Sequence, residues 1–178
     1  DIHMVIVDLH AAKDTREILN RLNHCYPFAE NETARRVQRY LGETNLGTVG
    51  EAVRLLQAGD AAGLGALMRR AQELFDTHVA PACPAQLTAP ALHRLLNHPP
   101  LQPLIFGGKG VGSQGDGTAQ LIARDAAAQK EIIRIVARDL GMSGLVLTLG
   151  SGAHVRKAVI PAAGFGTRLF PATKAVKK

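Results

Sequence analysis

The spacing of apolar residues changes along this chain, and the change separates a helical middle from strand-like ends. His3 to Asp8 is an almost wholly apolar run, which is typical of a buried strand. Apolar residues then recur at the three- and four-residue spacing of an amphipathic helix, most clearly between Ala61 and His78. The same spacing predicts further helices at 16–22, 31–41, 46–58 and 87–97.

Beyond residue 100 short apolar runs alternate with turn residues. The pattern predicts strands at 104–106, 118–123 and 145–149, and a helix from about Asp125 to Leu140. The predicted order is strand, helices, strand, hairpin-like loop, strand, helix, strand. This order favours an α+β fold, in which helices cover one face of a small sheet that is at least partly antiparallel.

Composition places the chain among globular proteins with one main core. It has 178 residues, of which 46% are apolar and 20% charged. The only two cysteines, Cys25 and Cys83, lie far apart in the sequence, so we expect reduced structural thiols. No apolar run approaches the roughly 20 residues of a membrane span, and no secretory signal is present, so we expect a cytoplasmic protein without membrane contact.

Net charge is concentrated at the C-terminus. The formal charge is +6, and six basic residues without an acid lie between Arg156 and Lys178, whereas residues 1–155 are balanced. A nucleic-acid surface would need basic side chains and aromatic rings on the main domain, yet the chain has no Trp and only seven Phe and Tyr. We therefore expect no nucleic-acid partner.

A glycine-rich segment runs from Gly107 to Gly117, with six glycines in eleven residues. Such density lets successive backbone N–H groups turn toward an anion, and it equally suits a tight hairpin. The part that matches GxGxxG precedes a strand rather than a helix, which argues against a dinucleotide-binding fold. The residues predicted to bind phosphate or nucleotide in this segment are Gly107, Gly108, Lys109, Gly110, Gly112, Ser113, Gln114 and Gly115.

Residues 46–149 resemble the C-terminal domain of the GHMP kinases, which phosphorylate sugars and isoprenoid precursors. The shared features are a helix ending at Gly59-Asp60, the long helix from Leu64 to Gln72, and the strand, glycine loop, strand, helix and strand that follow. The resemblance implies a ferredoxin-like fold with the glycine loop near the phosphates. It also implies that the ATP-cradling loop and the catalytic Asp belong to an N-terminal domain preceding this segment.

The C-terminal segment carries a second motif. An apolar run from Lys157 leads to Gly-Phe-Gly-Thr-Arg and then to Pro-x-Thr-Lys, which resembles the opening of sugar-1-phosphate nucleotidyltransferases of the UTP-glucose-1-phosphate uridylyltransferase group. The resemblance implies that UTP or another NTP binds here, that Arg168 and Lys178 are catalytic, and that downstream residues hold Mg²⁺. The implied nucleotide-binding residues are Ala163, Gly164, Gly166 and Thr167.

Together the two resemblances predict part of a bifunctional sugar-activating enzyme. Residues 1–150 would form the kinase C-terminal domain, 151–156 a linker, and 157–178 the start of a truncated nucleotidyltransferase domain. An ATP-dependent kinase would make a sugar 1-phosphate, and the fused enzyme would convert it to an NDP-sugar, with the isolated chain inactive. The alternative is a non-catalytic ferredoxin-like module that binds a phosphorylated ligand or a partner.

Overall fold

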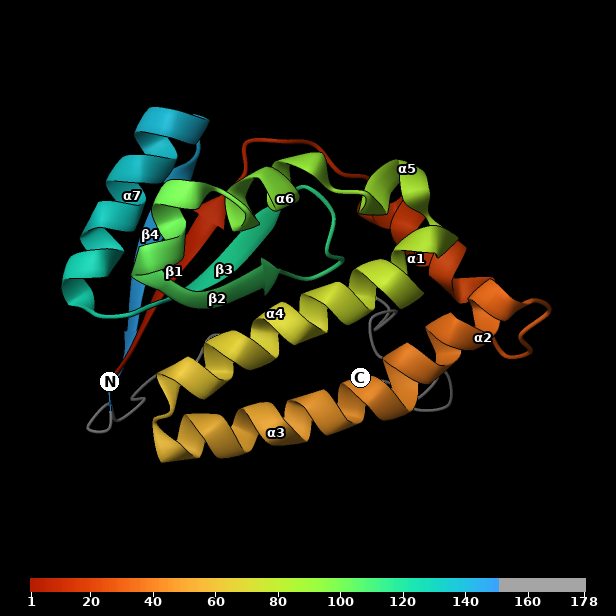
Figure 1. Ribbon diagram of the computed structural model, residues 1–178. Helices are drawn as coiled ribbons and strands as arrows, with labels where there is room; N and C mark the ends of the chain where they lie inside the picture. Colours follow the sequence, from red (N-terminus) through yellow and green to blue (C-terminus); the bar gives the residue numbers. More distant parts are fainter. Residues whose placement is uncertain (151–178) are drawn as a thin grey trace, which may run out of the picture.

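The computed structural model describes residues 1–150 as four strands and a series of helices (Figure 1). The strands are β1 (Ile2–Asp8), β2 (Ile105–Gly110), β3 (Thr118–Ala123) and β4 (Ser143–Leu149). The α-helices are α1 (Thr15–Asn23), α2 (Glu32–Arg39), α3 (Asn45–Ala58), α4 (Ala61–His78), α5 (Pro84–Leu87), α6 (Pro90–Leu96) and α7 (Ala126–Leu140). A π-helical turn, η1 (Tyr40–Thr44), joins α2 to α3, and the 3-10 turns are η2 (Ala80–Ala82) and η3 (Pro99–Leu104).

The four strands form one antiparallel sheet in the order β2-β3-β1-β4. Strand β1 lies in the middle, with Val5 opposite Leu121 of β3 and Val146 of β4. Strands β2 and β3 are joined by a hairpin, while β4 returns to β1 after α7. This is the predicted α+β architecture, and its strand order is that of a ferredoxin-like sheet.

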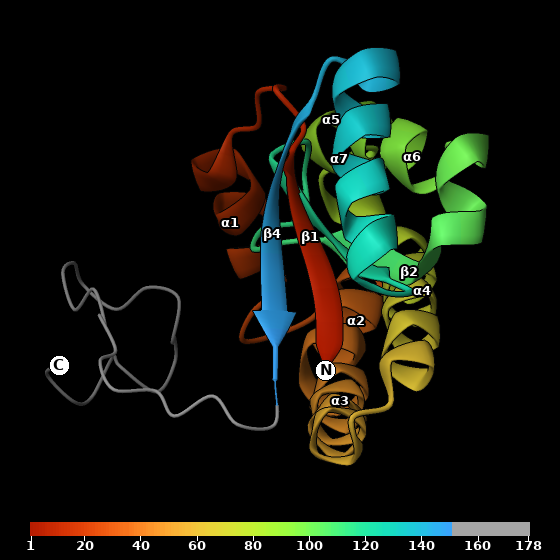
Figure 2. The same cartoon turned by 90° about the vertical axis from the view of Figure 1, so that its left-hand side faces the viewer.

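Helices cover both faces of the sheet, so the prediction that they cover only one face was wrong. Val5 and Val7 of β1 pack on one side with α6, α7 and η3. Met4 and its cross-strand partner Ile122 pack on the other side with Leu64 of α4, and Leu55 of α3 borders this cluster. Both sides of β1 are apolar, which explains the continuous apolar run in the sequence. Figure 2 shows α7 beside β1 and β4, with α3 below them.

Helix α4 lies unusually close to β2 because both elements have a glycine where they meet. A Cβ atom on Gly65 would lie 2.6 Å from the carbonyl carbon of Phe106, and a Cβ on Gly107 would collide with the Gly65 carbonyl oxygen. Real Cβ atoms do not approach so closely, so only glycine fits at either position. The Nε of Arg69 donates to the Phe106 carbonyl at 3.1 Å and ties the same edge of β2 to α4.

A second core lies away from the sheet, where α1, α2 and the C-terminal half of α4 meet. The rings of Tyr40 and Phe75 pack edge to face, 5.8 Å apart, and the Tyr40 hydroxyl donates to the Ala71 carbonyl. Cys25 and Cys83 are buried in this core as free thiols, as the sequence predicted.

Four helices begin directly after an Asp or Asn whose side chain caps the N-terminus. Asp14, Asn31, Asp60 and Asp125 are N-caps whose side chains accept backbone N–H groups of the following turn. The helix predicted at 87–97 is shorter in the structure: Leu87 is the last residue of α5, and α6 begins only at Pro90, after Ala89 with a φ of 43°. Within residues 1–150, no helix has the length and apolarity to cross a membrane.

The contact between Gly65 and Gly107 predicts that Gly107→Ala destabilises the fold. The added methyl group would force α4 and β2 apart, which typically costs about 1–3 kcal/mol. Urea unfolding followed by circular dichroism measures this cost. Gly47→Ala in α3 is the control, because a Cβ there meets nothing within 4 Å and favours the helix. Equal stability of the two variants would contradict the expectation.

Candidate functional site

The glycine-rich segment is partly strand and partly hairpin. Gly107, Gly108, Lys109 and Gly110 belong to β2, which extends four residues beyond the predicted strand. Only residues 111–117 form the turn that leads into β3. The sequence could not reveal this boundary, because glycines are unusual in a strand interior and here serve the close contact with α4.

The hairpin contains backbone N–H groups that have no hydrogen-bond acceptor among residues 1–150. The Val111 amide donates to Thr118 and the Gln114 amide donates to Val111, which closes the turn. The amides of Gly112 and Ser113 have no acceptor among residues 1–150. Gly112 and Gln114 both have φ near +69°, whereas Val111 and Ser113 do not have positive φ. Residues that alternate in this way between right- and left-handed backbone conformations turn successive amides toward one side. Phosphate binding by Gly112 and Ser113 stays a prediction.

Lys13 lies against the hairpin from the loop that follows β1. Its side chain crosses Gly115 and Gly117, whose ideal Cβ positions are 2.7–3.2 Å from Lys13 atoms. Its Nζ is 3.4 Å from the Val111 carbonyl oxygen. Burial lowers the pKa of the Lys13 ammonium from its ordinary value. Sequence reasoning did not identify Lys13 as a site residue, because no local signal in the sequence connects it with a hairpin 98 residues away.

Lys109 has a structural role at the base of the hairpin. Its Nζ donates to the Gly110 carbonyl at 2.6 Å, and burial lowers its pKa. The side-chain amide of Gln114 can be oriented so that both its nitrogen and its oxygen form hydrogen bonds. Its nitrogen then donates to the Gly110 carbonyl at 3.0 Å, and its oxygen accepts from Lys109 Nζ at 2.8 Å. The Gly110 amide donates to Gln72 of α4 at 2.8 Å. These groups bond one another and hold the hairpin, and phosphate binding by Lys109, Gln114 or Gly110 stays a prediction.

Asp116 anchors the hairpin to α6. Its carboxylate accepts the Leu92 amide at 2.8 Å and the Ala91 amide at 3.1 Å. On the other side, the Ser113 hydroxyl lies 3.4 Å from that of Thr15, in the first turn of α1. The hairpin is therefore fixed by both neighbouring helices while Gly112 and Ser113 stay accessible.

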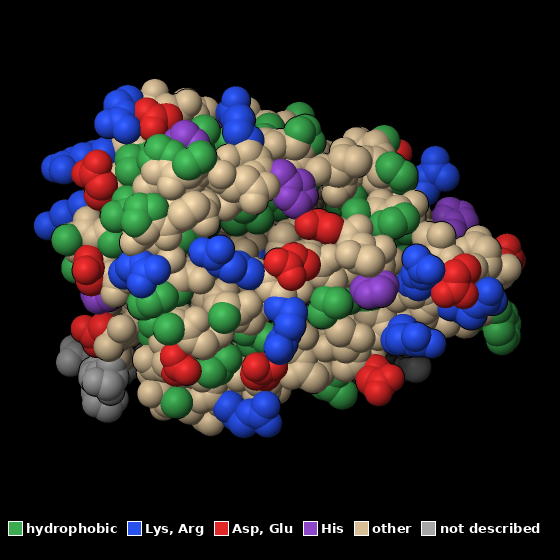
Figure 3. Space-filling view, in the orientation of Figure 1, with side chains coloured by type: hydrophobic (Ala, Val, Ile, Leu, Met, Phe, Trp, Pro, Cys, Tyr) green, Lys and Arg blue, Asp and Glu red, His purple; other side chains and the backbone are tan. Residues whose placement is uncertain are grey.

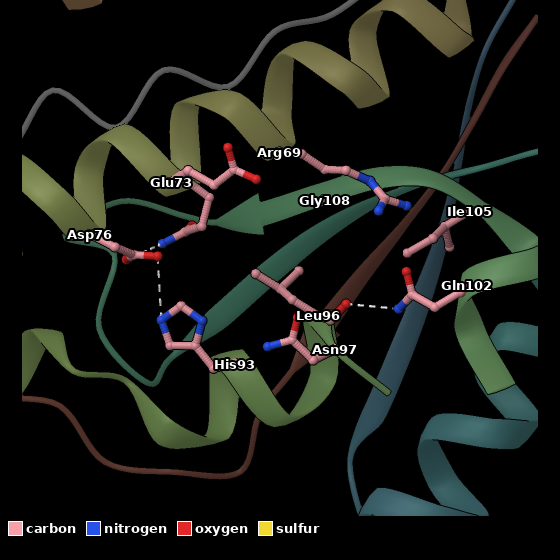
Figure 4. Close-up of a pocket in the computed structure, with 10 residues that line it drawn as sticks. Arg69, Glu73, Asp76, His93, Leu96, Asn97, Gln102, Ile105 and Gly108 are labelled. Atoms are coloured by element: carbon pink, nitrogen blue, oxygen red, sulfur yellow. Dashed lines mark hydrogen bonds and ion pairs between the residues drawn. The ribbon is translucent and has the colours of Figure 1, made fainter. Parts of the chain in front are cut away.

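A separate cleft of about 150 Å³ lies between α4, α6, η3 and β2 (Figure 4). His93 Nε2 lies 3.5 Å from an Asp76 carboxylate oxygen, whose other oxygen accepts from Gln72. Of the residues predicted to bind phosphate, only Gly108 lines this cleft. Its charged lining is mixed, with the carboxylates of Glu73 and Asp76 beside Arg69 and His93. The cleft and the hairpin are thus different places on the molecule.

The described residues do not fit a Mg²⁺ site. No group of three or more His, Cys, Asp or Glu side chains converges within residues 1–150. Near the hairpin, Asp14 caps α1 and Asp116 binds backbone amides of α6. Because both carboxylates already have partners, neither is available to hold a metal beside the hairpin.

The predicted nucleotidyltransferase site lies outside the described residues. It comprises Ala163, Gly164, Gly166, Thr167, Arg168 and Lys178. Their roles, and the division of the chain at 151–156, stay predictions.

The chain is similar in fold to solved kinase structures. It matches mevalonate kinase from L. major in complex with R-mevalonate at 18% identity and a TM-score of 0.59, over 78% of this chain and 39% of that one. It matches Lactococcus lactis galactokinase complexed with galactose at 18% identity and a TM-score of 0.58, over 85% and 46%. Streptococcus pneumoniae phosphomevalonate kinase matches at 15% identity and a TM-score of 0.55, over 81% and 39%.

These matches establish a shared fold with part of each kinase. All three are kinases of the GHMP group to which the sequence showed a resemblance, and the chain spans less than half of their length. No protein-family profile and no curated protein sequence matches the chain. At identities of 15–18% the likeness concerns the fold.

The contacts of Asp116 predict that Asp116→Ala loosens the hairpin. Two amides of α6 would lose their acceptor, and an unsatisfied amide costs about 1–3 kcal/mol. Hydrogen exchange at Ala91 and Leu92 should accelerate, and the urea midpoint should fall. Glu30→Ala, at an exposed carboxylate of the α1–α2 connection, is the matched control and should leave both unchanged. Unchanged exchange in Asp116→Ala would show that the anchor is unimportant.

Proposed function

We propose that residues 1–150 are one lobe of a GHMP-type kinase that transfers a phosphoryl group from ATP to a sugar or a related alcohol. The observation that carries the proposal is the β2–β3 hairpin, in which the Gly112 and Ser113 amides have no acceptor among residues 1–150 and Lys13 lies close by. The fold that contains this hairpin is similar to part of solved kinases. Two of the similar kinase structures contain R-mevalonate and galactose, so a hydroxyl-bearing small molecule is the substrate class that we infer. Such a kinase would act in the cytoplasm.

In this proposal the chain's own residues bind and orient the phosphate. The Gly112 and Ser113 amides donate to anionic oxygens, and the Lys13 ammonium offsets their charge. Phosphoryl transfer depends mainly on such positioning and electrostatic stabilisation. Mg²⁺, when bound by other parts of the kinase, would supply further neutralisation of the phosphates. The family resemblance assigns the ATP loop and the catalytic Asp to an N-terminal domain, so the isolated chain is proposed to be inactive.

A non-catalytic module is the alternative function. Free amides and a nearby lysine also suit simple binding of a phosphorylated ligand or partner without any transfer. The two proposals differ in one measurement. Only the kinase proposal requires that the longer polypeptide, including the upstream residues, phosphorylates a free hydroxyl compound with ATP.

We expect Lys13→Met in that longer polypeptide to reduce kcat/KM for ATP-dependent phosphorylation. Loss of one preorganised charge at a phosphate site typically costs on the order of 100-fold. Coupled ADP detection over a panel of sugars and mevalonate-like alcohols provides the measurement. Lys130→Met, at an exposed position of α7, is the control with the same change of side chain. The kinase proposal fails if a well-folded parent protein phosphorylates nothing in the panel, and the role of Lys13 fails if both variants retain full activity.

We further propose that residues 157–178 begin a nucleotidyltransferase that makes an NDP-sugar from UTP or another NTP. The support is the sequence motif alone. Backbone amides at Gly164 and Gly166 would approach the triphosphate, while Arg168 and Lys178 would stabilise the charge that develops on the leaving pyrophosphate. A kinase that makes a sugar 1-phosphate would supply the substrate of this second reaction. The fused protein would therefore catalyse two consecutive reactions.

Arg168→Ala tests this second activity. In a polypeptide extended through the downstream domain, the substitution should reduce UTP-dependent release of pyrophosphate by about 100-fold or more. Arg156→Ala, which removes the same charge before the motif, should leave the rate unchanged. Full pyrophosphate release by the Arg168 variant would reject the assignment of this residue.

A further inference from the structure

The outer edge of β2 presents backbone groups that have no partner in the described chain. The Val111 amide donates to the Thr118 carbonyl, so these two residues form a hydrogen-bonded pair of the antiparallel ladder. Hydrogen-bonded and non-bonded pairs alternate along such a ladder. Gly108 and Gly110 therefore belong to non-bonded pairs, and their N–H and C=O groups point away from β3.

The two sides of Gly108 are bonded to α4 at this edge, but Gly108 itself is not. The Phe106 carbonyl accepts from Arg69 Nε at 3.1 Å. The Gly110 amide donates to the Gln72 side chain at 2.8 Å. The N–H and C=O of Gly108 form no hydrogen bond with residues 1–150, although Gly108 is buried and lines the cleft between α4, α6, η3 and β2. Buried backbone groups are almost always bonded, so we expect a molecule in the cleft to bond them.

Charged side chains line the cleft in a definite order along α4. Arg69 bonds the beginning of β2 and Gln72 bonds its end, so the helix and the strand run in the same direction. Arg69 therefore marks a positive end of the cleft near the start of the strand, and Asp76 marks a negative end. Figure 4 shows the Glu73 carboxylate between them. Figure 3 shows basic, acidic and histidine side chains close together on the surface between α4 and α6.

Two of these charged groups are not used by the described part of the chain. The terminal nitrogens of Arg69 and the carboxylate of Glu73 have no hydrogen-bond or ion-pair partner among residues 1–150. The two side chains are one helical turn apart, where opposite charges commonly pair, yet no ion pair joins them. The Asp76 carboxylate is partly used, with Gln72 at 2.8 Å and His93 Nε2 at 3.5 Å. The cleft therefore offers both a cation and an anion to a ligand.

The backbone groups of Gly108 have the same polarity as the side chains. Along a strand, the N–H of a residue lies nearer its predecessor and the C=O nearer its successor. The Gly108 N–H is therefore on the side of Arg69, and both groups donate hydrogen bonds. The Gly108 C=O is on the side of Asp76, whose carboxylate likewise accepts them. A molecule with a carboxylate at one end and an ammonium group at the other satisfies both ends, whereas a phosphate or a metal ion satisfies only one.

The volume and the apolar part of the lining limit the size of such a molecule. The cleft has a volume of about 150 Å³. A cavity of this volume can hold a ring of the size of benzene, so we expect a ligand of roughly six to nine non-hydrogen atoms. Leu96 of α6 and Ile105 of β2 supply apolar surface. Free α-amino acids with a short apolar side chain combine this size with both charged groups and an apolar part.

We propose that this cleft binds a free α-amino acid with a short apolar side chain. Its carboxylate accepts from the Gly108 N–H and from Arg69. Its ammonium group donates to the Gly108 C=O and to the carboxylate of Glu73 or Asp76, while its side chain contacts Leu96. The site is separate from the β2–β3 hairpin and does not depend on the proposed kinase reaction.

Titration with L-valine, followed by amide NMR of the isotope-labelled 178-residue chain, tests the site. We expect saturable shifts of the Gly108 backbone amide and of the Gln72 side-chain amide, which lies between Asp76 and Gly110. Isobutylamine and isovalerate are the matched controls, because each retains the side chain of valine but lacks its carboxylate or its ammonium group. Each should bind at least about tenfold more weakly, since one set of charged hydrogen bonds is lost.

Glu73→Gln should weaken the binding of L-valine by about tenfold, because the amide no longer attracts the ammonium group. Glu73 is exposed, so the urea midpoint of this variant should equal that of the parent chain. Glu30→Gln makes the same change at an exposed position of the α1–α2 connection and should bind L-valine as the parent does. Unchanged affinity in Glu73→Gln would overturn the proposal.

Three further results would also overturn it. A Gly108 amide that shows no saturable shift with L-valine, L-alanine, L-threonine or L-leucine would show that the cleft holds only water. Equal affinity for isobutylamine or for isovalerate would show a simple cation or anion site. Shifts at the Gly112 and Ser113 amides instead of Gly108 would place the carboxylate on the hairpin, and the proposed phosphate site would then remain.

Discussion

The contact between α4 and β2 determines how the rest of this chain is arranged. Two glycines, Gly65 and Gly107, allow the backbones to touch, and this places α4 along the outer edge of the sheet. From there Leu64 reaches the cluster under β1, and Gln72 binds the amide of Gly110 at the start of the hairpin. A side chain at the glycine contact would displace all of these groups together. One steric constraint therefore controls both the core and the proposed phosphate site.

Hydrogen bonds to neighbouring elements hold the hairpin in place. Asp116 binds two backbone amides of α6, and Lys109 bonds the Gly110 carbonyl. The amides of Gly112 and Ser113, with Lys13 nearby, are the groups that we propose to bind a phosphate. A site fixed in this way loses little conformational entropy on binding, and this favours electrostatic stabilisation by a rigid frame.

Much of the fold could be predicted from the sequence. The helix at Ala61–His78 and the order of elements follow from apolar spacing and helix caps, which are local signals. Coverage of both sheet faces and the extension of β2 to Gly110 could not be predicted, because each depends on contacts between residues distant in sequence. Lys13 was missed as a site residue for the same reason, since only the fold brings it to Gly115 and Gly117.

Helix α4 contributes to both cores of the described chain. Its first half contributes Leu64 and Met68 to the cluster beneath the sheet, whereas Phe75 near its end belongs to the core with α1 and α2. Because one continuous helix is shared, a substitution that displaces α4 would disturb the packing of both cores at once, and we expect the two cores to unfold together.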